Sequence, residues 1–413
     1  MQLAVALQAI PFALVLLGIA IGPAVFPRVW HRRRLAILAA LCAWALLGTA
    51  VRAGGAAALA QAAEALVHQW VPFSALLLAL YATGGGILVT GGPWGRPLGN
   101  TLLLAIGTVL AGVLGTTGAV LVVVHPLLRA NIHRRYRAHL MVFLILLVGN
   151  VGGATTPLGD PPLMVGFLRG VPFLWPLHAL GLKMLALTAT LLAMFLATDS
   201  WLSRGEFAPR RAPLRVRGLG NIALAVIVVM LVAACGAAGE RAVVPCGFAW
   251  LVIALVSSRI TSESIRARNR FSWEPMAEVL VIFAAIFVTV PPVLAMLQMP
   301  AGLAAALDPM GLFWTAGVLS AVLDNTPTYL LFTHLGGTTP AILATADSSR
   351  LAAIAAGAVF FGGLTYIGNA PNLMVRAMAS HAGIRMPGFF RYAVLAGCAM
   401  APGLLLVGYW FVR

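Results

Sequence analysis

The chain has 413 residues, of which 61% are hydrophobic and only 9% are charged, and its formal net charge is +16. A water-soluble domain does not tolerate so apolar a surface, so the composition indicates a polytopic membrane protein. The arginines are scattered over short loops with no basic domain around them, which argues against a nucleic-acid partner.

Ten apolar runs are long enough to cross a hydrocarbon core of ~30 Å. They lie at about 3–22, 35–52, 71–91, 140–168, 172–198, 220–238, 242–258, 275–298, 350–377 and 388–411. The first run has no basic n-region and no clear cleavage site, so we expect a retained helix and not a signal peptide. Two further apolar stretches, about 100–128 and 311–335, are broken by GTTG and DNTP. We expect each of them to enter the membrane and return on the same side.

The distribution of basic residues predicts the orientation, because short cytoplasmic loops carry the excess of Lys and Arg. With the N-terminus outside and both broken stretches re-entrant, the inside loops hold 21 of the 27 basic residues. A full crossing by either broken stretch would reverse every later loop and remove this asymmetry. The net charge is therefore mainly a topology signal and an attraction to the anionic lipids of the bilayer, here the bacterial cytoplasmic (inner) membrane.

One motif occurs twice. GGATTPLGDPPLMV at 152–165 and GGLTYIGNAPNLMV at 362–375 are identical at seven of fourteen positions at an offset of 210. VLGTTG at 113–118 and VLDNTP at 322–327 align at an offset of 209. Under the predicted topology the two copies have opposite orientations, the sequence pattern of a secondary transporter with inverted repeats.

The predicted organisation is accordingly two inverted repeats joined by a linker. Each repeat contains one hairpin and one interrupted helix, and a cytoplasmic linker separates the repeats. The predicted boundaries are 1–200 for the first repeat, 201–218 for the linker and 219–413 for the second repeat, with hairpins at about 100–128 and 311–335 and interrupted helices at 140–168 and 350–377.

The breaks in the helices are the candidate transport site. Gly and Pro free backbone polar groups, which persist at membrane depth only where protein, water or a ligand satisfies them. Carbonyls and short polar side chains can replace the hydration shell of a small hard cation, and a carboxylate adds negative charge or an exchangeable proton. Asp160 and Asp324 are the candidate Na⁺ ligands, and no resident cofactor is expected. One cluster is predicted from Thr116, Thr117, Asn150, Thr155, Thr156 and Asp160, and another from Asp324, Asn325, Thr326, Thr365 and Asn369.

Structural roles remain open for several of these groups. Asp160 and Asp324 each precede a helix start with proline nearby and fit N-caps. Glu278 has a transport role or pairs with a basic residue at the cytoplasmic boundary, such as Arg270. Lys183 is a structural counter-charge, snorkels, or binds a substrate anion.

Other features are expected to be structural. The run RANIHRRYRAH at 129–139 is interpreted as a solvated inside loop, and GGG at 84–86 as a site of close helix approach. The four cysteines lie singly inside apolar segments with no paired spacing. We therefore expect packing residues and no disulfide bond.

The blocks GTTGAVLVVVHPLLRANIHRR, GNVGGATTPLGDPPLMVGFLRGVPF and LDNTPTYLLF resemble the signatures of the ion transporter superfamily. They are similar to arsenite permeases, NhaD-type sodium/proton antiporters and the citrate transporter-like branch. The resemblance covers about residues 70 to 400. It implies an all-α, elevator-type fold with scaffold and transport domains, and a homodimer formed through the scaffold. The site residues that it implies are Thr116, Thr117, Asn150, Thr155, Asp160, Asp324, Asn325, Thr326, Thr365 and Asn369.

Two transport functions compete, and sodium/proton antiport is favoured over cation-coupled citrate or dicarboxylate transport. The dicarboxylate branch typically has Ser-Asn-Thr at both hairpin tips, whereas this chain has Gly-Thr-Thr and Asp-Asn-Thr. Asp324 would repel an anion but would hold a cation or a proton. An enzyme is not expected, because neither a GxSxG-like context nor HExxH occurs. A channel is disfavoured because paired broken segments are typical of alternating access.

Overall fold

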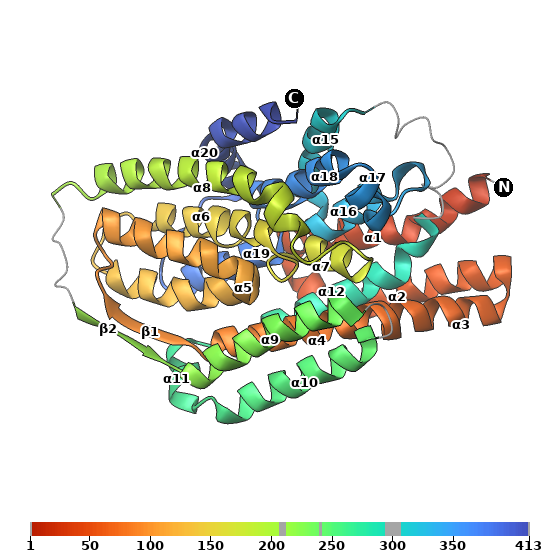
Figure 1. Ribbon diagram of the computed structural model, residues 1–413, viewed down its shortest axis with the longest axis horizontal. Helices are drawn as coiled ribbons and strands as arrows, with labels where there is room; N and C mark the ends of the chain where they lie inside the picture. The colour runs from red at the N-terminus through yellow and green to blue at the C-terminus, as the bar shows by residue number, and fades with distance from the viewer. Residues whose placement is uncertain (1, 206–211, 239–241, 294–306, 412–413) are drawn as a thin grey trace.

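The computed structural model describes residues 2–205, 212–238, 242–293 and 307–411. Most of the described chain is helical, and many of the helices run side by side along the long axis of the molecule (Figure 1). The described strands β1 (Leu88–Gly92) and β2 (Ala212–Arg217) form a two-stranded antiparallel ribbon at one end. An all-α polytopic fold is therefore confirmed, with a small ribbon that the sequence did not predict.

The helices before the linker form several long segments. In chain order they are α1 (Gln2–Val25), α2 (Pro27–Ala53), α3 (Gly55–Ala63), the π-helix η1 (Glu64–Trp70), α4 (Val71–Gly85), α5 (Pro97–Ala130), α6 (Ala138–Leu147), the 3₁₀ turn η2 (Val151–Thr155), α7 (Pro161–Leu168) and α8 (Trp175–Leu202).

The helices after the linker are shorter on average. They are α9 (Leu219–Ala238), α10 (Val243–Ile260), α11 (Glu263–Arg268), α12 (Glu274–Thr289), α15 (Pro309–Leu323), α16 (Asn325–Thr333), the 3₁₀ turn η4 (Leu335–Gly337), α17 (Pro340–Ala346), α18 (Ser348–Phe361), the 3₁₀ turn η5 (Gly362–Leu364), α19 (Ala370–His381) and α20 (Phe389–Tyr409).

Seven segments of the described chain are helical, long and apolar enough to cross a membrane. This confirms a multi-pass membrane protein, while the prediction of about ten crossings stays a prediction. The seven segments are Arg32–Ala53, Gly55–Gly85, Pro97–Ala130, Ala138–Thr155, Trp175–Leu202, Met276–Val293 and Phe389–Tyr409.

Both apolar stretches with central breaks are helical hairpins. In α5 the helical backbone is interrupted at Gly115, and Gly107 packs against Val123, which lies equally far beyond the break. The chain therefore turns back at Gly115. In the later stretch α15 and α16 contact each other and are joined at Asp324. Both turns fall in the GTTG and DNTP segments.

The run predicted as a helix at 71–91 has different ends. The helix begins much earlier, at Gly55, and α4 ends at Gly85, so that β1 occupies the last part of the predicted run. Glycines at 84–86 weaken the helix and permit close packing. A Cβ on Gly84 would lie 2.9 Å from the Cα of Gly118, so the expected close approach occurs here. The end of the predicted run at 275–298 and part of the linker lie outside the described residues.

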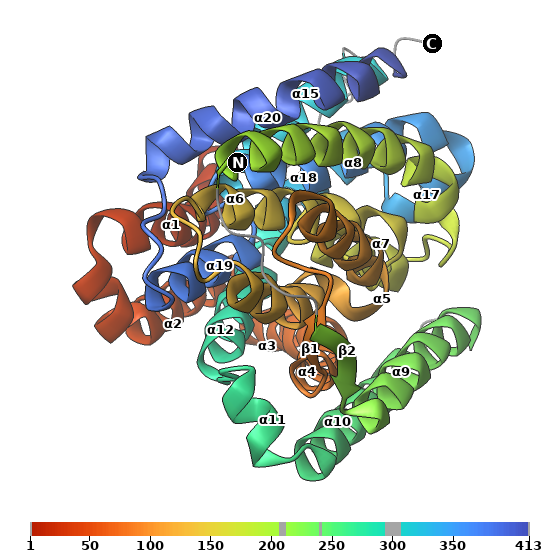
Figure 2. The same ribbon diagram turned by 90° about the vertical axis from the view of Figure 1, so that its left-hand side faces the viewer.

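Buried apolar side chains form two large packing groups. The first packing group joins α5, α6, α8, α15, α18 and α20. The second packing group joins α1, α2, α4, α9, α10 and α12, and it also includes side chains of α7 and α16. In Figure 2, α8 and α20 lie on the opposite side of the molecule from α9 and α10.

The expectation that all four cysteines are unpaired is wrong. Cys235, near the end of α9, forms a disulfide bond with Cys246, in the first turn of α10, and their Cα atoms are 6.4 Å apart. A spacing of eleven residues gives no local signal for a disulfide. The antiparallel packing of the two helices brings the cysteines together.

The basic run at 129–139 is only in part a solvated loop, which corrects the prediction. Asp199, fully buried at the end of α8, pairs with the almost fully buried Arg134. Its carboxylate also contacts His139 Nε2 at 2.8 Å and accepts a 3.0 Å hydrogen bond from Asn100. We call these residues, with Asn131, the Asp199 cluster. The cluster ties both ends of the α5 hairpin to α8, a long-range arrangement that a charge run does not reveal.

Candidate functional site

The two interrupted helices have the same backbone conformation where they resume. Asp160 precedes α7 with φ −141° and ψ 144°, and Asn369 precedes α19 with φ −154° and ψ 142°. Extended backbone at this position stops one helical segment and redirects the chain into the next. Asp160 and Asn369 are therefore structural counterparts, one acidic and one neutral.

Two threonines confirm this correspondence. Thr156 Oγ1 donates a hydrogen bond to the carbonyl of Gly112, and Thr365 Oγ1 donates to the carbonyl of Ala321. In each case the threonine ties the break to the first leg of its own hairpin. Both pairs of counterparts are 209 positions apart, not 210.

The ungapped alignment was therefore wrong by one residue at the breaks, where it opposed Asp160 to Ala370. The first copy contains the doublets GG, TT and PP. Single residues in the second copy match either member of a doublet, so residue identity does not define the register there. The hydrogen bonds of Thr156 and Thr365 to their own hairpins define the register.

The hairpin turns also share one conformation. Gly115 has φ 73° and ψ 156°, and Asp324 has φ 79° and ψ 152°. A positive φ is uncommon for a residue other than glycine, and such strain is concentrated at functional sites. Each half of the chain thus supplies one carboxylate, but the first half places it at the break and the second half at the hairpin turn.

Asp160 joins the two predicted clusters into one site. Its side chain is 1% exposed. It accepts a 2.7 Å hydrogen bond from Asn325 Nδ2 and a 3.0 Å hydrogen bond from Asn369 Nδ2. Both donors come from the second half of the chain. The Asp160 side chain makes no capping hydrogen bond to α7, so pure N-capping does not explain this residue.

A chain of amides extends inward from Asp160. Asn369 Nδ2 also lies 3.2 Å from Asn150 Oδ1, and Asn150 Nδ2 donates to Asn372 Oδ1 at 2.8 Å. Asn372 Nδ2 in turn donates to the carbonyls of Gly362 and Thr365. These amides therefore fix one another's orientation and hold the Asn369 N–H group toward the Asp160 carboxylate.

Sequence reasoning missed Ser320 and Asn372. Ser320 Oγ lies 2.9 Å from Asn325 Oδ1 and 2.6 Å from the carbonyl of Ala358. It thereby helps to direct the Asn325 amide toward Asp160. Asn372 is a second asparagine directly after the second break, in the run NAPN, and this was the available signal. Ser320 lies in a hairpin leg and had no comparable signal.

Asp324 has a mixed role. Its carboxylate accepts a 3.2 Å hydrogen bond from the backbone N–H of Thr326 and so caps α16, as the structural alternative predicted. It also lines a cavity that contains Asp160. Within the described chain, the fully buried Thr326 Oγ1 has no hydrogen-bond partner. Thr326 is not among the described residues that line this cavity.

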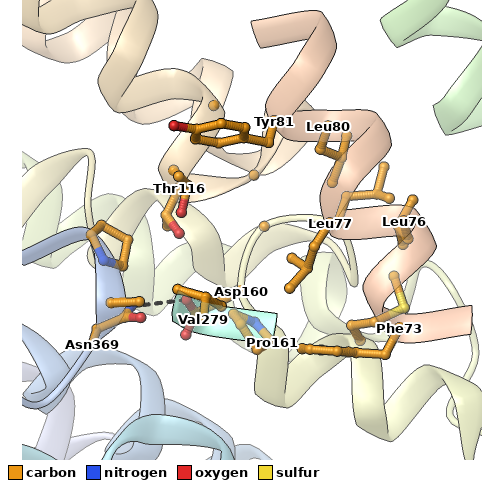
Figure 3. A pocket seen from close by; sticks show the side chains of 18 of the residues that line it. Phe73, Leu76, Leu77, Leu80, Tyr81, Thr116, Asp160, Pro161, Val279 and Asn369 are labelled. Atoms are coloured by element: carbon orange, nitrogen blue, oxygen red, sulfur yellow. Dashed lines mark hydrogen bonds between the residues drawn. The ribbon is translucent and has the colours of Figure 1, made fainter. Parts of the chain in front are cut away.

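The cavity, of about 40 Å³, lies between the hairpin turns and an apolar wall. Its volume accommodates a few water molecules. Thr116, Asp160 and Asn369 face Tyr81 and other side chains across it in Figure 3. No Lys, Arg or His side chain is found among the described residues that line it. Phe73, Leu76, Leu77, Leu80 and Tyr81 of α4 and Met276, Val279 and Phe283 of α12 form the apolar wall.

The remaining predicted threonines have different positions. Thr116 and Thr117 line the cavity, and the Thr116 N–H donates to the carbonyl of Gly159, which ties the first hairpin turn to the first break. Thr155 packs against Gly112, and a Cβ there would lie 2.4 Å from its Oγ1. Thr155, Thr156 and Thr365 thus hold the breaks against the hairpins.

Glu278 and Lys183 lie away from this cavity. Glu278 forms a 2.7 Å ion pair with Arg34 of α2, so the expected basic partner is present but is not Arg270. Lys183 donates to the carbonyl of Ala179 at 2.9 Å and lies over the ring of Phe411. Both contacts are structural, and the pairing with Arg34 depends on packing between helices far apart in the chain.

Comparison with known proteins places the chain in a family. No curated protein matches the chain. A family model described as "Putative citrate transport" matches residues 2–412, which is almost the whole length. Together with the apolar helices, this match identifies the chain as a multi-pass membrane protein that belongs to this family of secondary transporters.

Proposed function

We propose that the protein is a sodium/proton antiporter in which Asp160 and Asp324 alternately hold a cation and protons. The observation that carries this proposal is the charge of the cavity. Two carboxylates line it, and no basic side chain is found among its described lining residues. An anionic substrate would meet repulsion there, while a cation would be attracted.

The surroundings of Asp160 support this assignment. Its hydrogen-bond donors are the neutral amides of Asn325 and Asn369, and no ion pair to it occurs in the described part of the chain. A buried carboxylate without a counter-charge is costly at membrane depth. Binding either a cation or a proton removes that cost, so the two compete for the same group.

The oxygen-rich lining suits a hard cation. Small hard ions prefer carboxylate, carbonyl and hydroxyl oxygens. Asp160 and Asp324 offer carboxylate oxygens, and Thr116 and Thr117 line the same cavity. Protonation of the carboxylates would release the cation, which is the exchange required for antiport.

The matching backbone of the two breaks supports inverted repeats at 1–200 and 219–413, with re-entrant hairpins entering from opposite sides. In the proposed elevator arrangement, α1, α2, α4, α9, α10 and α12 form the scaffold. The first packing group, together with α7 and α16, carries the site across a bacterial inner membrane. The apolar wall of α4 and α12 would stay in place as the carboxylates pass it. Dimerisation through the scaffold would follow the resemblance.

The test uses purified protein in liposomes that contain a pH-sensitive dye. Na⁺, Li⁺ or citrate is added outside under a valinomycin and K⁺ voltage clamp, and K⁺ is added in a trial without the clamp. We expect proton flux on addition of Na⁺ or Li⁺ alone. A lack of flux with every cation, with uptake of labelled citrate, would contradict antiport.

A second candidate function, cation-coupled citrate transport, is favoured by the family description and by a separate cavity. This outer cavity, of about 560 Å³, lies between η1 and Phe287 on one side and α7, α16 and the start of α17 on the other. Its volume is within the ~300–1,000 Å³ typical of small-molecule sites. It is lined by Glu64, His68, Gln69, Arg169, His334 and Thr339, among others.

Arg169 supplies the positively charged group with which the outer cavity would bind an anion. Its guanidinium lies 2.9 Å from His334 Nε2 and 3.5 Å from Gln69 Oε1. His334 Nδ1 lies 2.9 Å from the carbonyl of Leu330, which only accepts, so Nε2 is unprotonated and accepts from Arg169. Both side chains within hydrogen-bonding distance of Arg169 in the described chain are therefore neutral. The Glu64 carboxylate lines the same cavity and interacts electrostatically with Arg169, so a substrate carboxylate would share the guanidinium with Glu64.

The two candidates are distinguished by Arg169→Gln, with the exposed Arg52→Gln as the matched control. If the protein exchanges Na⁺ for H⁺, Arg169→Gln retains Na⁺-driven proton flux. If it carries citrate through the outer cavity, the same variant loses citrate uptake while Arg52→Gln retains it.

A further inference from the structure

The disulfide bond between Cys235 and Cys246 joins α9 and α10 close to the ion cavity. Both cysteines belong to or pack against the second packing group, which also contains Phe73 and Phe283 of the cavity wall. The bond links the two helices at the end where they meet, away from the β1–β2 ribbon (Figure 1).

Only a short chain of contacts separates this bond from the cavity. Gly247 follows Cys246, and a Cβ on Gly247 would lie 3.3 Å from the Cα of Pro72. Pro72 directly precedes Phe73, whose side chain lines the cavity and packs on Phe283 with ring centroids 4.7 Å apart. The backbone of α10 therefore fixes the position of α4 at the level of the cavity wall.

The location of the bond also agrees with the predicted orientation. With the N-terminus outside, α9 runs outward, so the end of α9 that carries Cys235 lies toward the external side. Disulfide bonds persist in oxidising compartments and are rare where thiols are kept reduced. The cysteine pair and the arginine distribution thus independently place the same end of these helices outside.

We infer that the Cys235–Cys246 bond is a redox-sensitive cross-link, here called the staple, that is oxidised from the external side. The staple keeps α10 packed against α4. It thereby fixes the position of the cavity wall past which the transported ion moves. A thiolate of one cysteine attacks an external disulfide oxidant to form a mixed disulfide. The second cysteine then displaces the reduced oxidant. In total two protons and two electrons leave the pair, and the oxidant becomes a dithiol.

The test first counts thiols. Protein is extracted with N-ethylmaleimide, denatured, and treated with a polyethylene-glycol maleimide before or after reduction. We expect Cys42 and Cys398, the free cysteines, to be blocked at extraction. Two cysteines should become reactive only after reduction, and none in the variant Cys235→Ser/Cys246→Ser. If N-ethylmaleimide blocked all four cysteines of the wild-type protein without prior reduction, the disulfide bond would be absent and the proposal would be wrong.

The second part measures transport of whichever ion the liposome assay identifies, so that it does not depend on antiport. Dithiothreitol should slow wild-type transport several-fold, and reoxidation should restore it. The matched variant Cys42→Ser/Cys398→Ser should respond as the wild type does. The variant Cys235→Ser/Cys246→Ser should be slow from the start and insensitive to dithiothreitol. An intact bond whose reduction leaves the transport rate unchanged would overturn the functional role of the staple.

Discussion

Asp160 and Asp199 are both buried aspartates, 1% and 0% exposed, but their surroundings differ. Asp199 has Arg134 and His139 as partners, together with the Asn100 amide. Asp160 has only the amides of Asn325 and Asn369 within the described chain. The Asp199 carboxylate has the arginine charge beside it, whereas a carboxylate whose partners are amides has no positive charge from them. The second arrangement leaves room for an ion or a proton.

The largest expected effect comes from Asp160→Asn. The amide removes the charge while keeping the size, so cation affinity should fall on the order of 100-fold or more, because a unit charge at ~4 Å is worth about 4 kcal/mol at an effective dielectric constant near 20. Thermal stability should be unchanged or higher. Na⁺-driven proton flux and thermal unfolding check this prediction.

The matched control is Asp347→Asn. Asp347 also precedes a helix, α18, and caps it through the N–H of Arg350, but it is exposed. This variant should transport normally. Normal transport by Asp160→Asn as well would exclude Asp160 from the mechanism.

Asp199→Asn should have the opposite profile. Removing the charge of one partner of a buried ion pair destabilises a protein by about 3–5 kcal/mol. Transport per folded molecule should be close to that of the wild type. The measurements are the thermal midpoint in detergent and flux normalised to folded protein. A normal midpoint with lost transport would assign Asp199 a direct role.

Asp324→Gly would make the second hairpin turn match the first. Glycine accepts φ 79° without strain, and relief of such strain is worth about 1 kcal/mol, although the cap on Thr326 is lost. Stability should therefore change little, while cation-driven flux falls strongly. Asp324→Asn retains capping capacity and should lose flux as well. If only the glycine variant lost flux, capping and not charge would be the function of Asp324.

The smallest effect is expected from Ser320→Ala. Its hydroxyl helps to orient Asn325, which contacts Asp160, and loss of such outer contacts weakens ion sites by about 10-fold or more. We expect a higher Na⁺ concentration for half-maximal flux with a similar maximum rate. Thr345→Ala, at an exposed hydroxyl of α17, is the control. An unchanged half-maximal concentration would show that Asn325 is oriented without Ser320.

The sequence by itself determined the membrane setting and the positions of the two broken stretches, and it predicted most of the residues that the structure brings together around Asp160. These follow from local physics: apolar length sets which segments can cross a bilayer, and glycine, proline and polar residues at membrane depth mark where helices stop. The turns at Gly115 and Asp324 and the breaks before Asp160 and Asn369 were visible for this reason.

Only the tertiary structure decided how these segments combine. Asp160 meets Asn325 and Asn369 from the other half of the chain, Glu278 pairs with Arg34, and Cys235 bonds to Cys246. Each contact depends on packing between separate helices. Local sequence patterns carry no information on which helices become neighbours. Doublets such as GG and PP also hid the change of offset from 210 to 209 between the two copies of the motif. The sequence therefore predicted two clusters of polar residues, whereas packing joins residues of both around Asp160.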